Sequence, residues 1–196
     1  MGNEKASNRI IVLVGRSAAG KDSVASALSQ RHPELHRAIS TTSRPIRSGE
    51  QNGLDYYFIS KEKFAEKSMQ GKFWDEVVYH AYKDNKLEDW YYGLEKDKNN
   101  LLKDNFIIAC DLPRLRQLKA RLGDRVVSIY IDTPTEQRRL RAVAREKKFN
   151  IVEWERRVSD ENYVFKGIEK EVDYIVKNDI LEECLKQVEN IYKWHA

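Results

Sequence analysis

Gly15, Gly20 and Lys21 have the spacing of a phosphate-binding loop, within the stretch IIVLVGRSAAGKDSVASAL from Ile10 to Leu28. An apolar run precedes the first glycine, and a helix-forming segment follows the lysine. Glycines let successive backbone N–H groups surround phosphate oxygens, the helix N-terminus adds the positive end of its dipole, and the lysine reaches the terminal phosphates. The alternative is a glycine-containing turn with an exposed lysine, but spacing and context together favour nucleotide binding. The residues predicted to bind the nucleotide are Gly15, Arg16, Ser17, Ala18, Ala19, Gly20, Lys21, Asp22 and Ser23.

Asp22 stands where such loops usually carry the serine or threonine that binds Mg²⁺. A carboxylate is also a hard oxygen ligand, so Asp22 is the candidate metal ligand, directly or through water. Its charge beside a polyphosphate is unfavourable unless the metal or nearby arginines offset it. The loop is therefore predicted to be competent but altered.

Asp111 ends the apolar run NFIIACD, and two roles are open for it. At the carboxyl end of a parallel strand beside a phosphate loop, a carboxylate meets Mg²⁺ or a ligand. Asp111 is equally well placed to cap the following helix LPRLRQLKARL, whose Pro113 suits a first turn. One residue can do both.

Arg44 and Arg47 lie three residues apart in ISTTSRPIRSGEQNGLDYYFIS, a segment rich in hydroxyl groups. Two guanidinium groups at this spacing could fork onto one phosphate, with Ser40 and Tyr56 as neutral donors. A polar loop with a solvated arginine pair is an equally good interpretation of these residues alone. Other phosphate chemistries fit less well: no guanine-specifying N-K-x-D motif follows a buried strand, and no H-R-D or D-F-G motif is present.

The elements that must position these residues alternate between apolar strands and helices. The runs RIIVLVG, NFIIACD, RVVSIYID and VDYIVKND predict strands, and helical segments follow them. Near-continuous apolar strands of this kind indicate a parallel sheet covered on both faces. Residues 40–95 break the rhythm, because GLDYYFIS and KFWDEVVYHAY alternate more like antiparallel strands, and they predict a small inserted α+β lobe. The basic stretch from Arg141 to Arg157 predicts a mobile surface segment between helices.

The composition excludes several classes of protein. The 196 residues include 35 Lys+Arg and 31 Asp+Glu, a net charge of only +4 with both signs interleaved, so a general nucleic-acid-binding surface is not expected. No apolar run is long enough to cross a bilayer. Cys110 and Cys184 lie in apolar segments and are expected to be buried, reduced thiols. We expect a cytoplasmic protein, a monomer or homodimer, whose partners are small-molecule nucleotides rather than nucleic acid or membrane.

The segment from Ile39 to Ser60 resembles the nucleoside-monophosphate-binding segment of guanylate kinases, whose pattern is close to S-x-T-T-R-x-P-R-x-G-E-x-[DN]-G-x-D-Y-x-F. The similarity continues through KFWDE, WYYG, RLRAVARE, WERRVSDE and IVKND, and therefore covers nearly the whole chain. These motifs are more specific than the glycine loop alone. The matching residues of the first segment are Ser40, Arg44, Arg47, Gly49, Glu50, Gly53, Asp55, Tyr56 and Phe58.

The resemblance implies a single α/β domain over residues 1–196, with the fold of the phosphate-binding-loop nucleoside monophosphate kinases. Its parallel-sheet core comprises residues 8–39 and 96–196, its inserted monophosphate-binding lobe residues 40–95, and its helical lid residues 141–157. The implied reaction is phosphoryl transfer from ATP, with Mg²⁺, to GMP or dGMP. Lys21, Arg44 and the lid arginines Arg141, Arg145 and Arg157 are implied to be catalytic, and Asn178 to lie near the adenine.

The acceptor site is implied in the same way. Ser40, Arg44, Arg47, Tyr56 and Tyr92 correspond to residues that hold the GMP phosphate. Asp75, with Glu76 as a fallback, corresponds to a glutamate that binds the guanine edge, and Asp111 to an aspartate near the base and metal. Leu94 stands at a base-contacting position.

Three departures from the family pattern bear on the acceptor. Leu94 replaces a Ser or Thr that touches the guanine oxygen, Asp75 is one methylene shorter than the usual glutamate, and the predicted loop from Val78 to Trp90 is longer. GKDS also occurs in the related ribose bisphosphate kinases. The alternatives are therefore a kinase for a different or modified nucleotide or for a sugar phosphate such as ribose bisphosphate, and a non-catalytic protein-binding module.

Overall fold

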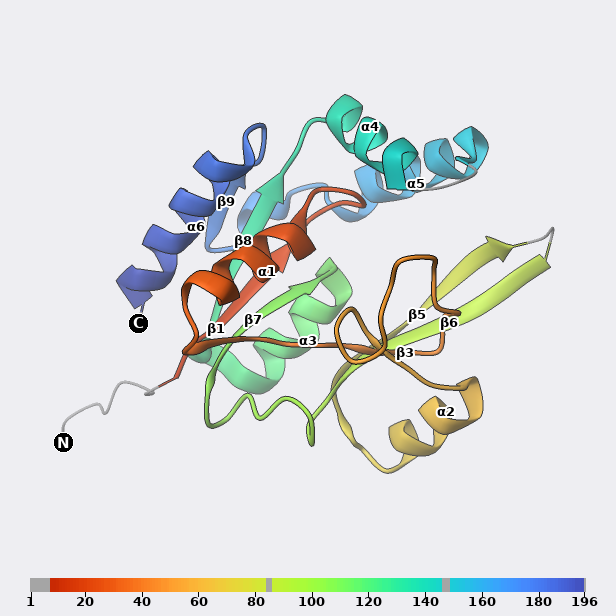
Figure 1. The fold of residues 1–196 in the computed structure, drawn as a ribbon, viewed down its shortest axis with the longest axis horizontal. Helices are drawn as coiled ribbons and strands as arrows, with labels where there is room; N and C mark the ends of the chain where they lie inside the picture. The colour runs from red at the N-terminus through yellow and green to blue at the C-terminus, as the bar shows by residue number, and fades with distance from the viewer. Residues whose placement is uncertain (1–7, 84–85, 146–148, 196) are drawn as a thin grey trace.

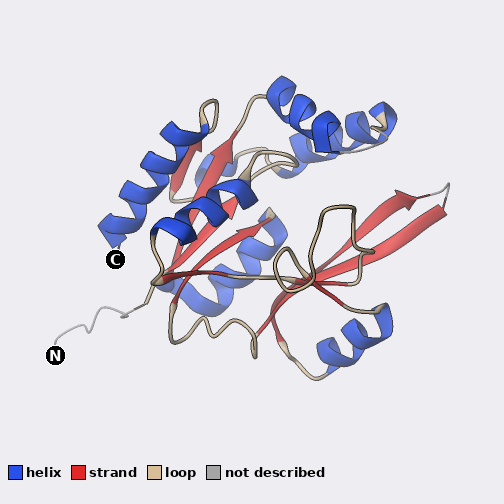
Figure 2. Cartoon of the chain, viewed as in Figure 1, coloured by secondary structure: helices blue, strands red, loops and turns tan. Residues whose placement is uncertain are grey.

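The computed structural model describes residues 8–83, 86–145 and 149–195, and two sheets organise them (Figures 1 and 2). The larger sheet has five parallel strands in the order β2-β7-β1-β8-β9. The strands are β1 (Ile10–Val14), β2 (Leu35–Arg37), β7 (Asn105–Cys110), β8 (Val126–Asp132) and β9 (Tyr174–Lys177). The predicted fold class, an α/β protein with a parallel core sheet, is confirmed.

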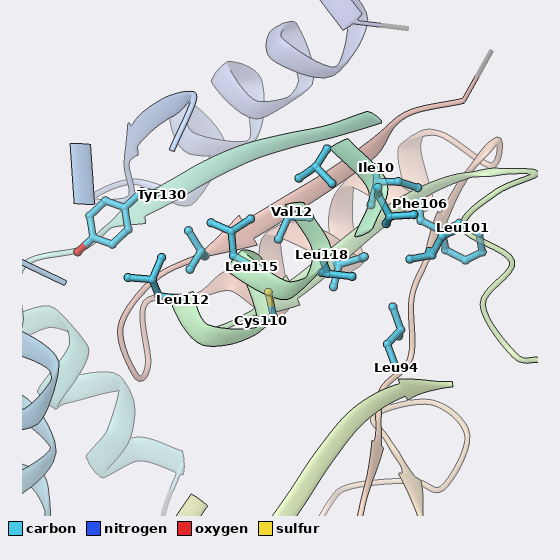
Figure 3. Close-up of a cluster of buried hydrophobic side chains, with 14 of the residues drawn as sticks. Ile10, Val12, Leu94, Leu101, Phe106, Cys110, Leu112, Leu115, Leu118 and Tyr130 are labelled. Atoms are coloured by element: carbon cyan, nitrogen blue, oxygen red, sulfur yellow. The ribbon is translucent and has the colours of Figure 1, made fainter. Parts of the chain in front are cut away.

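Helices cover both faces of this sheet, because its central strands are apolar on both sides. Ile10, Val12 and Val14 of β1 join one cluster with the apolar face of α3 (Leu112–Leu122) (Figure 3). Ile11 and Leu13 join the other, with α1 (Lys21–Arg31) and α6 (Leu181–His195). Full burial of one such aliphatic side chain contributes roughly 1.5–3 kcal/mol. The sheet is therefore a rigid base for the loops at its carboxyl edge.

The smaller sheet and α2 (Lys61–Met69) form a lobe between β2 and β7, on the right in Figure 1. Its strand order is β4-β3-β6-β5. The prediction that GLDYYFIS forms an antiparallel strand is wrong: within it only Tyr57–Phe58 forms a strand, and that strand pairs in parallel with β3. The strands are β3 (Thr41–Thr42), β4 (Tyr57–Phe58), β5 (Phe73–Lys83) and β6 (Lys86–Glu95).

The described part of the segment from Val78 to Trp90, which was expected to be a long loop, is an extension of the β5–β6 hairpin, and residues 84–85 lie outside the described residues. Val78 pairs with Tyr91, and Tyr79 with Trp90. Farther along, His80 Nδ1 lies 2.6 Å from Asp89 Oδ1 across the strands. Aromatic and β-branched cross-strand pairs of this kind stabilise a two-stranded ribbon.

Helices α4 (Thr135–Arg145) and α5 (Ile151–Val164) lie on the far side of the glycine loop from α6, and short 3₁₀ helices occupy Gly123–Arg125 and Ile168–Lys170. The buried Arg138 of α4 forms an ion pair with Glu161 of α5 at 2.8 Å. The predicted lid at 141–157 thus covers the end of α4 and the start of α5, and its residues 146–148 lie outside the described residues. Cys110 and Cys184 are buried and unbonded to each other, as expected. None of the described helices combines the length and apolarity that a membrane span requires.

Candidate active site

A cavity of about 520 Å³ lies between the glycine loop, the β5–β6 hairpin, the start of α3 and α5. Both phosphate-loop and small-lobe residues contribute to its wall, so it brings together groups far apart in the sequence. A second groove, of about 600 Å³, follows α2 and the hairpin, and the glycine loop is not part of its wall. The predicted site residues on the wall of the first cavity are Gly15, Ser17, Lys21, Asp22, Arg47, Tyr56, Tyr92, Asp111 and Arg157.

The glycine loop has the backbone geometry that its sequence requires. Gly20 has φ +93, and a Cβ there would lie 2.6 Å from Asn178 Nδ2, so another residue would be strained at this position. Lys21 opens α1 and lies across the loop, where its Nζ donates to the carbonyls of Gly15 (2.8 Å) and Arg16 (3.2 Å). The lysine head group is therefore held at the loop, beside the cavity.

Three side chains converge behind the loop on one carbonyl oxygen, that of Ala19. Asn178 Nδ2 donates to it at 2.8 Å, Thr133 Oγ1 at 2.9 Å and Arg141 Nη1 at 3.1 Å. Asn178 is 1% exposed, and neither Asn178 nor Arg141 is on the cavity wall. Both residues therefore support the loop in this structure, and their expected contacts with the adenine and with the ATP phosphates stay predictions.

The other predicted lid arginines lie nearer the acceptor side. Arg157 is on the cavity wall, and its Nε donates to Glu153 Oε1 at 2.8 Å. Arg145, at the end of α4, lies close enough to lower the pKa of Arg47 through charge repulsion, although desolvation contributes more to that shift. The predicted loop residues that are off the wall are Arg16, Ala18, Ala19, Gly20 and Ser23.

Asp22 follows Lys21 in the first turn of α1 and reaches the cavity. Its side chain is 66% exposed and lies 3.6 Å from Arg37 Nη2, a distance that leaves the carboxylate accessible. The described residues contain no group of three or more His, Cys, Asp or Glu side chains that could hold a metal by themselves. Mg²⁺ in kinases usually has one or two carboxylates and completes its shell with phosphate and water. An accessible carboxylate beside the loop fits that requirement.

Arg44 and Arg47 separate in the structure, although the sequence suggests a matched pair. Arg44 is 3% exposed, forks onto Glu50 at 2.8 and 3.0 Å, and donates from Nε to the Tyr92 hydroxyl at 3.1 Å. It is off the cavity wall, whereas Arg47 is on it. Arg44 thus orders the loop and Tyr92, and Arg47 faces the cavity.

Arg47 is an exposed residue on the wall of the cavity. Desolvation lowers the pKa of Arg47, and the positive charges of Arg44 and Arg145 lower it further. An anion bound beside these three cations would relieve their repulsion. Burial also raises the pKa of the Tyr56 phenol, which stays a neutral donor at the same wall. This part of the cavity is suited to a phosphate.

We expect Arg47→Ala to raise the KM for the monophosphate acceptor by about 10- to 100-fold, since a charge-assisted hydrogen bond contributes roughly 1.5–3 kcal/mol. The KM for ATP should change little. The matched control is Arg31→Ala, an exposed arginine on α1 paired with Glu182 away from the cavity. Initial rates at varied acceptor and fixed ATP give both constants, and an effect confined to ATP would contradict the assignment of Arg47.

The residues expected to bind the base are not where the resemblance places them. Asp75 is fully buried, and its Oδ1 accepts from Arg114 Nη2 at 2.9 Å and from the Leu94 amide at 2.9 Å. The side chain of Leu94 points into the apolar core rather than into the cavity (Figure 3). Glu76 borders the groove along α2 instead. The expected base contacts of these three residues therefore do not agree with the structure.

A bulge explains this arrangement. The register of β5 against β6 shifts between Phe73 and Glu76, which turns Asp75 inward. Gly93 sits opposite, and a Cβ there would lie 2.8 Å from Phe73 Cδ1 and 2.9 Å from the Asp75 carbonyl. Only glycine lets the strands approach so closely.

Of the two roles that its sequence position left open, the structure shows that Asp111 is a helix cap, and the ligand-binding role stays a prediction. It caps α3, with Oδ1 accepting from the Arg114 amide at 2.9 Å, and it also reaches the cavity. Desolvation raises the pKa of this carboxyl, partly offset by the charge of Arg114. Ser40, expected at the acceptor phosphate, is buried and accepts from Arg114 Nη2 at 3.0 Å.

Three features of the wall were not predicted from the sequence: Arg114, the hairpin residues Tyr79 and Trp90, and Arg156 of α5. Arg114 follows the capping Asp111 by three residues, on the face of α3 that also carries buried leucines. An arginine within an apolar helix face is a signal that could have singled it out, because such a group needs a buried partner.

The architecture and the cavity define a phosphate-binding-loop kinase, with a loop for phosphates, an inserted lobe that carries a cationic acceptor side, and arginines from α5. Comparison with known proteins narrows this class. The family model described as guanylate kinase matches residues 7–194. The chain belongs to the guanylate kinase family, as its resemblance implied.

Individual relatives agree with this placement. The guanylate kinase of Trichormus variabilis is 31% identical over 189 residues, which cover 93% of this chain and 88% of that protein. The guanylate kinase of Sulfurimonas denitrificans is 32% identical over 183 residues, covering 90% and 83%. The crystal structure of guanylate kinase from Anaplasma phagocytophilum matches with a TM-score of 0.69 at 24% identity, covering 95% of this chain and 85% of that one. This last likeness bears on the fold alone.

Proposed function

We propose that the protein transfers the γ-phosphoryl group of ATP to a nucleoside monophosphate, with GMP or dGMP as the acceptor. The observation that carries the proposal is the shared cavity. Lys21 of the glycine loop and Arg47, Tyr56 and Tyr92 of the inserted lobe face the same space. A donor phosphate at the loop and an acceptor phosphate at the lobe would then meet within it.

The chemistry requires no catalytic base. The acceptor is itself a phosphate, largely ionised near neutral pH because its second pKa is about 6. Its oxygen is already the nucleophile, and it attacks the γ-phosphorus in line as the bond to the β-phosphate oxygen breaks. The protein therefore contributes positioning and charge neutralisation. In this proposal Lys21 stabilises the transferred phosphoryl group, and Arg47 and Tyr56 bind the acceptor phosphate. Arg157 and Arg145 neutralise negative charge where the donor and acceptor phosphates meet.

Mg²⁺ is part of the proposal, with Asp22 as its protein ligand. When bound, the ion neutralises the charge that develops on the β- and γ-phosphate oxygens. The accessible carboxylate of Asp22 would hold it from the start of α1. Asp111 is the less suitable ligand, because its Oδ1 already caps α3.

ADP release, coupled to NADH oxidation, tests the function. The acceptor panel is GMP, dGMP, AMP, UMP, CMP and ribose 1,5-bisphosphate, each with saturating ATP and Mg²⁺. We expect the highest kcat/KM with GMP or dGMP. A higher value for the sugar bisphosphate would reject a nucleotide acceptor, and no acceptor-dependent release at all would favour a non-catalytic binding module.

We expect Asp22→Ala to shift the Mg²⁺ concentration for half-maximal activity upward, because the loop loses its hard oxygen ligand. The KM for the acceptor should remain within about threefold of wild type, since the charge-assisted acceptor contacts are untouched. Calorimetric titration with ATP, in Mg²⁺ and in EDTA, gives a second readout. An unchanged gain in affinity from Mg²⁺, together with an unchanged midpoint, would mean that Asp22 is not a metal ligand.

A further inference from the structure

Arg114 of α3 contributes a buried cation to the wall of the cavity. The residue is 4% exposed, and its Nη2 donates to Ser40 Oγ at 3.0 Å and to Asp75 Oδ1 at 2.9 Å. Nε is buried without a partner, and Nη1 has no acceptor among the residues that the structure describes. Because Arg114 lines the cavity, the two N–H groups of Nη1 are the ones free to serve a bound molecule.

The charge of this guanidinium is fixed. Burial alone lowers the pKa of Arg114, but the negative charge of Asp75 and smaller contributions from Cys110 and Asp111 outweigh it, and the net pKa is raised. Arginine carries donors only, so this position can pair with an acceptor atom and never with another donor.

The position of Arg114 within the cavity points to the base of the acceptor. Arg47, Tyr56 and Tyr92 are the groups suited to the acceptor phosphate, and α5 contributes the polar groups of the lid side. Helix α3, whose Gln117 is hydrogen-bonded to the backbone of Glu76 in β5, contributes Asp111 and Arg114 beside the hairpin. Tyr79 and Trp90 of the hairpin line the same cavity and offer flat apolar surfaces. A planar base stacked against these surfaces would present its polar edge to the start of α3.

We propose that Arg114 is the residue that selects the base, by donating from Nη1 to the 6-oxo oxygen of a purine monophosphate. This inference rests on the proposed function and names the determinant of its specificity. Guanine and hypoxanthine both present O6 as an acceptor, whereas adenine presents an amino donor there. The guanidinium of Arg114 would thus replace the hydroxyl donor that Leu94 lacks.

A second consequence concerns the 2-amino group of guanine. Asp75, the carboxylate expected to accept from that group, is fully buried and is not on the cavity wall. Its Oδ1 accepts from Arg114 and from the Leu94 amide, and its Oδ2 is buried without a partner in the described part of the chain. It therefore neutralises Arg114 instead of contacting the base. The protein should distinguish purines by the 6-oxo group and be nearly indifferent to the 2-amino group.

Four monophosphates separate these two contacts without any substitution in the protein. GMP has both groups, IMP only the 6-oxo group, 2-aminopurine riboside monophosphate only the 2-amino group, and AMP neither. We expect kcat/KM for IMP to lie within tenfold of that for GMP. The two compounds that lack the 6-oxo group, 2-aminopurine riboside monophosphate and AMP, should have a kcat/KM about tenfold or more below that for GMP. A loss of tenfold or more with IMP would overturn the inference while leaving the kinase function intact. No activity with any of the four would reject the function itself.

A double variant tests Arg114 directly. Arg114→Met/Asp75→Leu removes the cation together with its counterion, so that neither charge is left buried alone. We expect the GMP to AMP ratio of kcat/KM to fall by about tenfold or more. The control is Arg116→Met, an exposed arginine on the same helix paired with Glu171, which should keep the wild-type ratio. An unchanged ratio in a double variant with wild-type circular dichroism would overturn the inference, and the four-compound comparison decides it if that variant does not fold.

Discussion

Lys21→Ala is expected to lower kcat by at least about 10²–10³-fold while leaving the protein folded. The lysine Nζ is held at the glycine loop by the carbonyls of Gly15 and Arg16, beside the cavity. A cation placed in advance where negative charge develops lowers the barrier, and one lost donor of this kind costs on the order of 10²–10³ in kcat. Truncation removes that cation and no core contact, because Lys21 is outside both apolar clusters.

The measurement is single-turnover transfer from γ-labelled ATP to GMP, alongside the midpoint of urea unfolding. Lys103→Ala is the matched control, since Lys103 is exposed in the turn before β7 and should retain wild-type kcat. Near-normal turnover in a correctly folded Lys21→Ala protein would be incompatible with a phosphoryl-transfer mechanism at this loop.

The core of the fold was predictable because its signals are local and strong. The five-residue apolar strand β1, the loop after it and the helix α1 follow one another without a break, and each has a distinct residue pattern. Strand β2 escaped prediction because only three residues, Leu35–Arg37, are extended, and their pairing with β7 fixes them. Strand β4 is two residues long and depends on β3 in the same way. Short strands are specified by their neighbours more than by their own residues.

The candidate site divides along a similar line. Residues whose direction is set by a local motif, such as Lys21 at the start of a helix and Asp111 at a helix cap, reach the cavity as their positions suggest. Asp75 does not, because a bulge shifts the register of β5 between Phe73 and Glu76. A register shift of one residue turns the side chains of a strand to the opposite face of the sheet, and the residue types around Asp75 do not predict such a shift.

The residue types also do not predict which acidic side chain each arginine pairs with. Arg44 and Arg47 share a type and a loop, yet only Arg44 meets Glu50 in a two-pronged ion pair. The positive charge of Arg44 is thereby neutralised within the protein, whereas Arg47 lines the cavity. Arg114 likewise becomes interpretable only when its buried partner Asp75 is known, since these two residues are 39 positions apart in the chain.

Asp75→Asn is expected to lower the free energy of unfolding by about 3–5 kcal/mol, because it leaves the charge of Arg114 buried without its hydrogen-bonded counterion. The substitution keeps the shape of the side chain and an oxygen that can still accept from the Leu94 amide, so the loss reports mainly on charge. Asp124→Asn, at an exposed aspartate in the turn after α3, is the control and should stay within about 0.5 kcal/mol of wild type.

Urea unfolding followed by circular dichroism gives these differences, provided that the slope m is unchanged between proteins. The double variant Asp75→Leu/Arg114→Met should be more stable than Asp75→Asn, because replacing both members of a buried ion pair with apolar residues costs far less than removing one. The opposite pattern is equally easy to recognise. If Asp75→Asn kept wild-type stability and lost only its preference for GMP over AMP, Asp75 would be a base-binding residue, and its ion pair with Arg114 would have to open when the acceptor binds.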